Sequence, residues 1–259
     1  MPSTPLSVCI ITYNEAANLP RCLASVAFAE DIVVVDSQST DSTVAIAQAA
    51  GCRVFVQPFL GYVVQKNLAL RHALHRWVLC LDADEWLRPG AEARIREALA
   101  TRTPDVAGYT LQRHTYYLGA WINHGGWWPE YKLRLFDHQR GQWCGDALHE
   151  GVRVHGRVAH LEVEIGHRSY TDMAHHLTKL NTYTTVMADT LHTRGAARVG
   201  GWTLLGHALG RFYRMFLLKG GWRDGLRGLI IAVIAAFYVF MKYAKLWERQ
   251  HGGQPPPEE

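Results

Sequence analysis

The chain lacks several features that would define special classes of protein. It has 5 cysteines in 259 residues, an odd number without a Cys-x-x-Cys pair, so neither a disulfide framework nor a cysteine zinc site is indicated. Three of them lie inside apolar runs and read as small buried hydrophobic residues. Residues 1–15 show no basic segment followed by a long apolar one, which argues against a cleaved signal peptide. We therefore expect the protein to stay in the reducing compartment where it is made.

Two phosphate-binding motifs are also missing. The first strand is not followed by Gly-x-Gly-x-x-Gly, and no Gly-Lys-Ser/Thr loop occurs, which counts against dinucleotide-binding and P-loop proteins and against sugar nucleotidyltransferases with a glycine-rich loop. The net charge of +4 is too small to indicate nucleic acid as a partner. The 14 histidines, including His175 and His176, show no zinc spacing. Self-association is left open.

Apolar runs alternate with helical patterns over the first hundred residues. Strands are expected at Leu6–Thr12, Ile32–Asp36, Arg53–Val56 and Trp77–Asp82, with helices from about Asn14, over 41–51 and over 62–75. Asn14 and the Ser39–Asp41 cluster offer helix caps, and Gly51 offers a stop. This rhythm predicts an α/β fold with a mixed, mostly parallel sheet flanked by helices.

The later part of the chain changes character twice. Residues 106–165 suggest shorter strands and loops rich in Trp, His and Gly, and residues 171–192 suggest a helix. We predict a catalytic domain over 1–195, with a donor half 1–100 and an acceptor half 101–195. A basic, apolar helical region is expected over 196–250 and a disordered tail over 251–259.

Polar clusters follow three of the expected strands. They are Thr12-Tyr13-Asn14-Glu15, the segment from Asp36 and Ser37 to Asp41, and Asp82-Ala83-Asp84-Glu85. Functional groups on an open parallel sheet gather at the carboxyl ends of its strands, so these clusters together predict a nucleoside slot. Asp82 and Asp84 offer oxygen ligands for Mg²⁺ or Mn²⁺ bridging a diphosphate. Each cluster alone reads equally well as a cap, turn or surface loop.

The combination of motifs resembles glycosyltransferase family 2. The residues that carry the likeness are Val8–Glu15, Val33–Thr43, Gln65-Lys66-Asn67 and Leu81–Glu85, and within the family the bacterial lipopolysaccharide-core β-1,4-glucosyltransferases look most similar, over about residues 6–170. Gln38 departs from the pattern, because many relatives have Gly or another small residue there, which leaves the shape of that turn open.

The resemblance implies a GT-A-type fold, a UDP-sugar donor and a metal-dependent, inverting transfer. It assigns Lys66 to the neighbourhood of the nucleotide, Asp84 to the metal as principal ligand with Asp82 nearby, and the uridine to Thr12, Tyr13, Asn14, Glu15 and Asp36.

Inversion by direct displacement needs a general base near the acceptor hydroxyl. Similar family members have a His-Glu pair in this region, so we predict Glu150 as the base, with Glu130 as second choice and Asp146 and Asp137 behind them. In the alternative without a catalytic role, Glu150 is a solvated turn residue and His149 is a hydrogen-bonded structural histidine. We otherwise place His149 at the acceptor.

Aromatic and basic residues of the acceptor half are further candidates. Trp127 and Trp128 are predicted to stack on an acceptor sugar, as Trp121 and Trp143 could, although all four suit a core equally well. Lys132 and Arg134 lie two apart on one strand face, where they would suit phosphate groups or be ordinary solvated charges.

The C-terminal region predicts contact with a membrane surface. Residues 202–218 suggest a basic amphipathic helix, and Leu229–Met241 is an apolar run shorter than the about 20 residues of a span. The alternative is a pair of helices packed on the catalytic domain or in an oligomer.

We therefore expect a cytoplasmic hexosyltransferase attached peripherally to the inner membrane. By the resemblance it transfers glucose to the lipopolysaccharide inner core. The alternatives are polyisoprenyl phosphate or another envelope glycan as acceptor, or a nucleotide-sugar-binding protein without turnover.

Overall fold

The computed structural model describes residues 4–146 and 149–252. The chain divides into two compact units. The first comprises residues 1–114 and 130–168, and the second comprises residues 115–129 and 169–259. This division differs from the predicted boundary at residue 195, because the predicted helix over 171–192 groups with the C-terminal helices. The predicted tail over 251–259 lies mostly outside the described residues.

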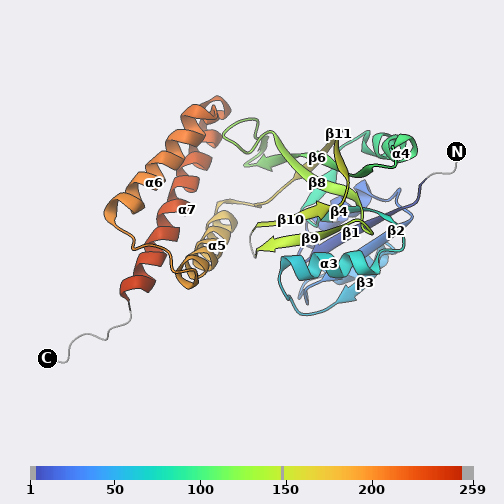
Figure 1. The fold of residues 1–259 in the computed structure, drawn as a ribbon, viewed down its shortest axis with the longest axis horizontal. Helices are drawn as coiled ribbons and strands as arrows, with labels where there is room; N and C mark the ends of the chain where they lie inside the picture. The colour runs from blue at the N-terminus through green and yellow to red at the C-terminus, as the bar shows by residue number, and fades with distance from the viewer. Residues whose placement is uncertain (1–3, 147–148, 253–259) are drawn as a thin grey trace. The chain divides into compact units, whose positions relative to one another are not determined.

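The first unit is built on a mixed sheet with the order β3-β2-β1-β4-β8-β6-β11-β5 (Figure 1). Parallel pairing joins β3, β2, β1 and β4, and the later pairs of β4 with β8, β8 with β6, and β11 with β5 are antiparallel. The strands are β1 Leu6–Thr12, β2 Asp31–Asp36, β3 Arg53–Val56, β4 Trp77–Asp82, β5 Glu85–Leu87, β6 Val106–Tyr117, β8 Glu130–Asp137 and β11 Arg157–His167. The mixed α/β fold class is confirmed.

Helices and a hairpin cover both faces of the parallel part. Apolar side chains of α1 (Leu19–Ser25), α2 (Thr43–Ala49) and α4 (Ala91–Thr101) pack in one core with β1 and β4. The other face packs against α3 (Tyr62–His72) and a hairpin of β9 (Gly141–Asp146) and β10 (His149–Val154). Burial on both faces explains why these strands are apolar throughout.

Two local predictions need correction, and a third holds. Helix α1 begins at Leu19, so Asn14 is not its cap; Asn14 instead has φ of 53° and accepts a hydrogen bond from the Thr40 amide. Strands β6 and β11 have 12 and 11 residues, which is longer than expected for this region. Gly51 does follow the end of α2 with φ of 76°, as predicted.

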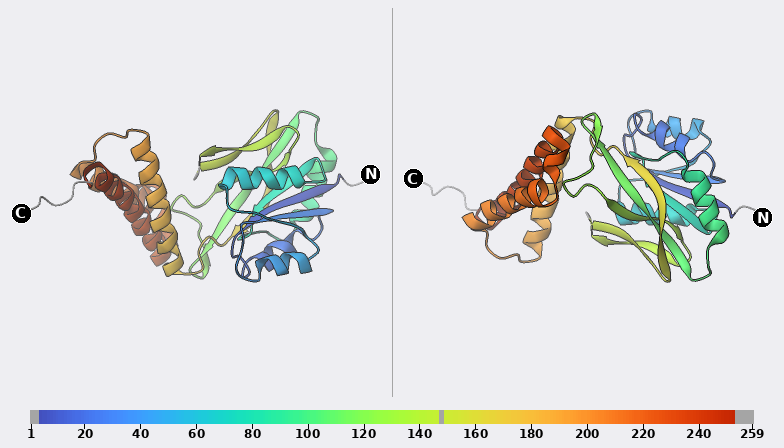
Figure 2. Two further views of the ribbon diagram at one scale, coloured as in Figure 1. Left: turned by 90° about the horizontal axis from the view of Figure 1, so that it is seen from below. Right: turned by 90° about the horizontal axis from the view of Figure 1, so that it is seen from above.

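The second unit is helical (Figures 1 and 2). It contains the short β7 (Ala120–Trp121), α5 (Met173–Thr193), α6 (Gly201–Tyr213), a π-helical turn (Arg214–Leu218), a 3₁₀ turn (Gly221–Asp224) and α7 (Gly225–His251). Helix α7 packs against both α5 and α6. One core of this unit combines Tyr117 and Ile122 of the 115–129 segment with Met215, Ile231 and Ala232.

All five cysteines are free, and Cys9, Cys22 and Cys80 are buried in the first unit. Burial raises the pKa of the Cys22 thiol well above its usual range. They serve as small core residues, as predicted.

Candidate active site

The three polar clusters meet at one edge of the sheet. Register pairs Thr12 of β1 with Asp36 of β2, and Ile11 with Asp82 of β4. Because these three strands are parallel neighbours, their carboxyl ends coincide. The structure thus brings together the residues that the sequence placed after separate strands.

The first two clusters are interlocked by short hydrogen bonds. Asp36 is fully buried, and its carboxylate accepts from the amide and hydroxyl of Ser39, at 2.8 and 2.5 Å. The Ser39 hydroxyl in turn accepts from the Asn14 amide at 2.8 Å. Asp36 therefore fixes the turn that joins the clusters, while the ring of Tyr13 is 58% exposed beside it.

Neighbouring residues extend this frame. The Glu15 amide donates to Thr43 Oγ1 at 2.8 Å, and Asp41 accepts from the amide of Ala16 at 3.2 Å. The Ser37 amide donates to the Thr12 carbonyl at 2.9 Å. Residues from both clusters thus share one rigid loop assembly.

The backbone conformation at Gln38 defines the shape of the turn that the sequence left open. Its φ is 63°, in the left-handed region that favours glycine. The turn therefore keeps the backbone that a small residue would allow, at some cost in strain for glutamine.

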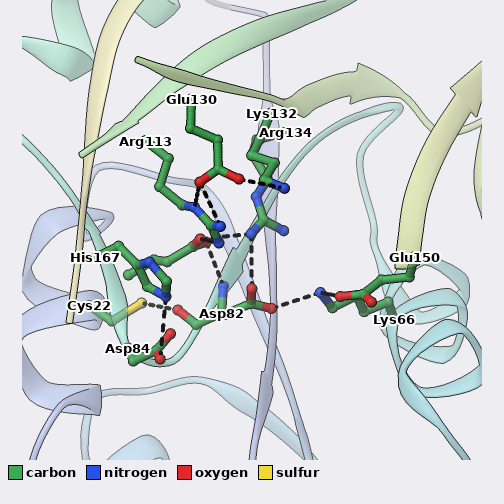
Figure 3. A network of polar contacts seen from close by, with 11 residues as sticks. Cys22, Lys66, Asp82, Asp84, Arg113, Glu130, Lys132, Arg134, Glu150 and His167 are labelled. Atoms are coloured by element: carbon green, nitrogen blue, oxygen red, sulfur yellow. Dashed lines mark hydrogen bonds and ion pairs between the residues drawn. The ribbon is translucent and has the colours of Figure 1, made fainter. Parts of the chain in front are cut away.

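Asp82 lies at the centre of an ion-pair network, shown in Figure 3. Its carboxylate is 2.9 Å from both Lys66 Nζ and Arg134 Nη2. Burial alone would raise the pKa of Asp82, but these two cations outweigh it and hold the pKa well below its usual range. Asp82 is accordingly an ionised carboxylate whose oxygens already have cationic partners.

Arg134 is not on an exposed phosphate-binding face. Its side chain is 4% exposed and also lies 2.7 Å from Glu85, which is fully buried. Glu85 in turn pairs with Arg113 at 3.2 Å. Burial opposes the charge of Arg134, yet Glu85 and Asp82 raise its pKa. This placement favours a structural role for Arg134 beneath Asp82, whereas Lys132 is 39% exposed.

Asp84 points to a different neighbour from Asp82. Its Oδ2 is 3.6 Å from Nε2 of His167, at the end of β11, and its carbonyl accepts from the Arg168 amide at 3.0 Å (Figure 3). Pairing of His167 with Glu85 across β11 and β5 places the imidazole there. Ala83 between the two aspartates is buried. His167 had no local signal in the sequence that set it apart from the other histidines.

Asp84 offers a carboxylate oxygen, the kind of ligand that Mg²⁺ and Mn²⁺ prefer, and the His167 imidazole nitrogen lies beside it. The described residues gather no group of three or more His, Cys, Asp and Glu side chains. Such a small protein donor set still fits a cation that takes further ligands from substrate phosphates.

The two candidate bases have different surroundings. Glu150 Oε1 lies 3.0 Å from Lys66 Nζ, and its side chain is 21% exposed. Glu130 is held between Arg113 at 2.7 Å and Lys132 at 2.9 Å. Burial would raise the pKa of Glu130, but Arg113 and Lys132 lower it overall. A carboxylate with two cationic partners is the weaker proton acceptor.

Helix α3 holds the hairpin that carries Glu150. The Asn67 side chain donates to the Trp143 carbonyl at 2.9 Å and accepts from the Trp143 amide at 3.0 Å. Lys66, next in sequence, contacts Glu150 and lies 4.4 Å from the Trp143 ring centre. The motif Gln65-Lys66-Asn67 does not by itself predict this clamp of Asn67 on β9.

The remaining acceptor candidates have other immediate neighbours. Trp127 and Trp128 belong to the second unit, where Trp127 packs edge-on against Tyr117. Trp143 is buried beside Lys66, and Trp121 contacts Tyr116. These contacts of Trp127 and Trp143 match the core alternative. The side chains of His149 and Asp146 lie outside the described residues. Asp137 is buried and paired with Arg76 at 2.7 Å.

Comparison with known proteins places the chain among glycosyltransferases. The sequence profile of "Glycosyl transferase family 2" matches residues 7–153. The chain is 32% identical over 261 residues to the lipopolysaccharide core biosynthesis glycosyltransferase LpsC of Rhizobium meliloti, covering 96% of this chain and 94% of that one. It is 30% identical to an uncharacterized glycosyltransferase of Rickettsia felis, covering 94% and 89%.

Among solved structures, S. aureus TarS 1–349 in complex with UDP-GlcNAc is similar with a TM-score of 0.48 and 14% identity, over 96% of this chain and 92% of that one. The profile match and the LpsC-like relative each cover more than half of the chain. The chain belongs to glycosyl transferase family 2.

Proposed function

We propose that this protein is an inverting, metal-dependent hexosyltransferase that uses a UDP-sugar donor. The observation that carries the proposal is the meeting of Asn14, Asp36 and Asp84 at the carboxyl ends of three parallel strands, in a member of family 2. Asn14 and the turn that Asp36 holds in shape would lie at the nucleoside, and Asp84 would lie at the diphosphate.

The donor pocket divides its work among rigid and exposed groups. Asp36 and Ser39 hold the turn in shape, while the exposed ring of Tyr13 is available to stack on the uracil. Lys66 lies between Asp82 and Glu150 and supplies positive charge where the diphosphate would lie.

Asp84 and His167 would hold the divalent cation, with Asp82 nearby but already paired. The cation would offset the charge that develops on the departing UDP. Asp84 and His167 would orient the diphosphate by fixing where that cation sits, and buried Arg134 would keep Asp82 ionised beside them.

Glu150 would act as the base. In the single displacement, the acceptor hydroxyl attacks the anomeric carbon, the bond from that carbon to the diphosphate oxygen breaks, and the hydroxyl proton passes to Glu150. Glu150 has one cationic partner, whereas Glu130 is held between two that lower its pKa, which favours Glu150 over Glu130 as the base.

The acceptor is a saccharide on a lipid, and lipopolysaccharide inner core with glucose as the transferred sugar is the specific proposal. The relative named for lipopolysaccharide core biosynthesis matches this chain over nearly its whole length, which supports that choice. Such an acceptor is presented at a membrane, so the enzyme would act at the cytoplasmic face of the inner membrane as a peripheral protein.

The test is UDP release from a panel of UDP-sugars, with lipid acceptor extract, Mn²⁺ and then EDTA. We expect release from one donor, lost with EDTA and in Asp84→Ala, and reduced by about 10²–10⁴-fold in Glu150→Gln. Glu162→Gln, an exposed carboxylate on β11 whose side chain is 78% exposed, is the matched control and should keep full activity.

Other outcomes would redirect the proposal. Full activity in Glu150→Gln would move the base to Glu130. Label transferred to polyisoprenyl phosphate would replace the acceptor. An absence of release with every donor and acceptor extract would favour a binding protein without turnover.

A further inference from the structure

Helix α6 carries an apolar stripe that the fold leaves open to solvent. Trp202 is 90% exposed, Leu205 57%, Leu209 68% and Tyr213 53%. The residues are three or four positions apart and so lie on one side of the helix. Exposed apolar side chains are ordinary when scattered, but a continuous stripe of large ones marks an interaction surface.

Helix α7 carries a second stripe with the same spacing. Leu226 is 71% exposed, Leu229 37%, Val233 49% and Phe237 45%. Between Leu229 and Met241 the sequence has no charged residue at all. We call the eight residues of the two stripes the apolar face.

None of the eight residues of the apolar face belongs to the hydrophobic cores described for the helical unit. Other sides of the two helices are already buried, at Ala208 on α6 and at Ile231, Ala232 and Ile234 on α7. The helices pack against each other and α7 packs on α5 (Figure 2). Burial of the exposed stripes therefore requires something outside the unit.

The charge of this region indicates the chemistry of the partner. Residues 201–247 contain seven Lys and Arg residues and one acidic residue, Asp224. The carboxylate of Asp224 accepts a hydrogen bond from the His124 amide at 2.8 Å and lies 2.9 Å from Nδ1 of the His124 ring. Five of the seven cations are exposed and lie at or near the connection from α6 to α7: Arg211, Arg214, Lys219, Arg223 and Arg227.

This charge disfavours a second copy, because two such regions would repel each other. It favours an anionic lipid surface, where basic side chains meet headgroups and apolar ones enter the acyl boundary. Trp202, Tyr213 and the 58% exposed Trp222 are side chains typical of that boundary.

Residues 221–251 are long and apolar enough to cross a membrane, by length and composition. However, α7 is tied to the polar helix α5: Lys245 Nζ donates to Asn181, Thr184 and Thr185, and Arg249 pairs with Asp189 at 2.5 Å. A spanning α7 would carry the Thr- and Asn-rich surface of α5 into hydrocarbon, which is costly.

We infer that α6 and α7 lie lengthwise in the headgroup layer of an anionic membrane, with the apolar face buried in it and neither helix spanning it. The inference deepens the proposed function by naming the lipid surface as a partner of the helical unit.

The test is co-sedimentation of the full chain, without sugar nucleotide, with vesicles of phosphatidylcholine alone or mixed with phosphatidylglycerol. We expect detergent-free protein to bind the mixed vesicles and to be released by high salt. Leu205→Ser with Leu209→Ser should weaken binding about tenfold. Leu74→Ser, which removes a 67% exposed leucine of the first unit, should not.

Arg211→Gln with Arg214→Gln should remove the preference for the anionic lipid, and helical circular dichroism checks that each variant is folded. Lack of binding by the wild type would overturn the inference, as would protein that only detergent releases from membranes, which would indicate a span. Because the binding assay contains no sugar nucleotide, failure of binding with UDP release intact would overturn the membrane inference and leave the proposed transfer reaction standing.

Discussion

Lys66 and Asn67 show how two adjacent side chains can serve one site. Lys66 contacts the candidate base, and Asn67 grips both backbone groups of Trp143 on the neighbouring strand. The hairpin β9–β10 pairs only with itself within the described strands, so this clamp is a main tie between the hairpin and α3. We regard Asn67 as a positioning residue for Glu150.

Removal of the clamp should slow transfer without weakening donor binding. In Asn67→Ala we expect kcat to fall about ten- to a hundredfold with little change in KM for the UDP-sugar, because a shift of about 1 Å at the base has effects of this size. Asn67→Asp keeps the acceptor for the Trp143 amide but loses the donor to the Trp143 carbonyl, so its kcat should lie between those of the wild type and Asn67→Ala. Steady-state kinetics measure both.

Hydrogen exchange at the Trp143 amide is the second measurement, and it should speed up in Asn67→Ala. Gln142→Ala, an exposed change on the same strand, is the control and should alter neither quantity. If the amide exchanges faster while kcat stays at the wild-type value, Asn67 holds the hairpin but has no part in placing the base.

The donor residues could be predicted from sequence because each follows an apolar strand, and strand ends of a parallel sheet must meet. The surroundings of Asp82 could not. Arg134 is buried only because Asp82 and Glu85 arrive from a distant part of the chain to pair with it. His167 meets Asp84 through the antiparallel pairing of β11 with β5, and no local pattern encodes that pairing.

At the scale of elements, helix α5 contains a buried histidine with a marked electrostatic signature. His176 Nδ1 lies 2.7 Å from the Tyr117 hydroxyl, and its ring stacks on Tyr170. Burial, followed by the nearby His175 and Lys179, lowers the pKa of His176 to about 4. Between about pH 4 and about pH 6.5 the folded helical unit therefore keeps this imidazole neutral, whereas an unfolded chain would protonate it.

The stability that depends on His176 should be lost in acid. An unfolded histidine titrates near about 6.5, so below that pH the unfolded chain gains a proton that the folded chain refuses until about pH 4. The contribution is complete above about pH 6.5 and declines as the pH falls towards 4. Relative to His176→Phe, the wild type should lose about 1–2 kcal/mol of unfolding free energy between about pH 7 and pH 5.

Urea unfolding followed by helical circular dichroism at both pH values gives this difference. The other titratable groups are the same in wild type and variant, so their contributions to the pH dependence cancel. Parallel stability profiles for the two proteins would mean that His176 carries no pH dependence.

The strands and helices with strong patterns were placed well, since β1 and β3 have the predicted bounds and α5 starts and ends within about two residues of its predicted range. The acceptor half was harder. Strand β6 (VAGYTLQRHTYY) begins with a run of buried residues and then mixes buried and half-buried positions, so no single period describes it. The strand is long because its first part pairs with β8 and its last residues, Tyr116 and Tyr117, pair with β7.

At the scale of the whole molecule, the two units are interleaved along the chain. The first unit stops at residue 114 and resumes at 130, and the segment between belongs to the helical unit. Tyr117 and Ile122 of that segment are each 1% exposed, in a core completed by Met215 and Ile231. The catalytic unit is therefore not obtained by cutting the chain at one point.

A chain of residues 1–168 should aggregate, because Tyr117, Ile122 and Trp127 would lose the helices that cover them. Arg113 and Glu130 are paired neighbours in β6 and β8, so a short Asn-Gly turn can replace residues 115–129. We expect this closed version of 1–168 to elute as a monomer on size exclusion. It should also be stabilised by UDP with Mn²⁺ in thermal unfolding, because Asn14, Asp36 and Asp84 all remain. Equal solubility of the two truncated chains would show that segment 115–129 does not depend on the helices. A soluble closed chain that UDP does not stabilise would place part of the donor site outside the first unit.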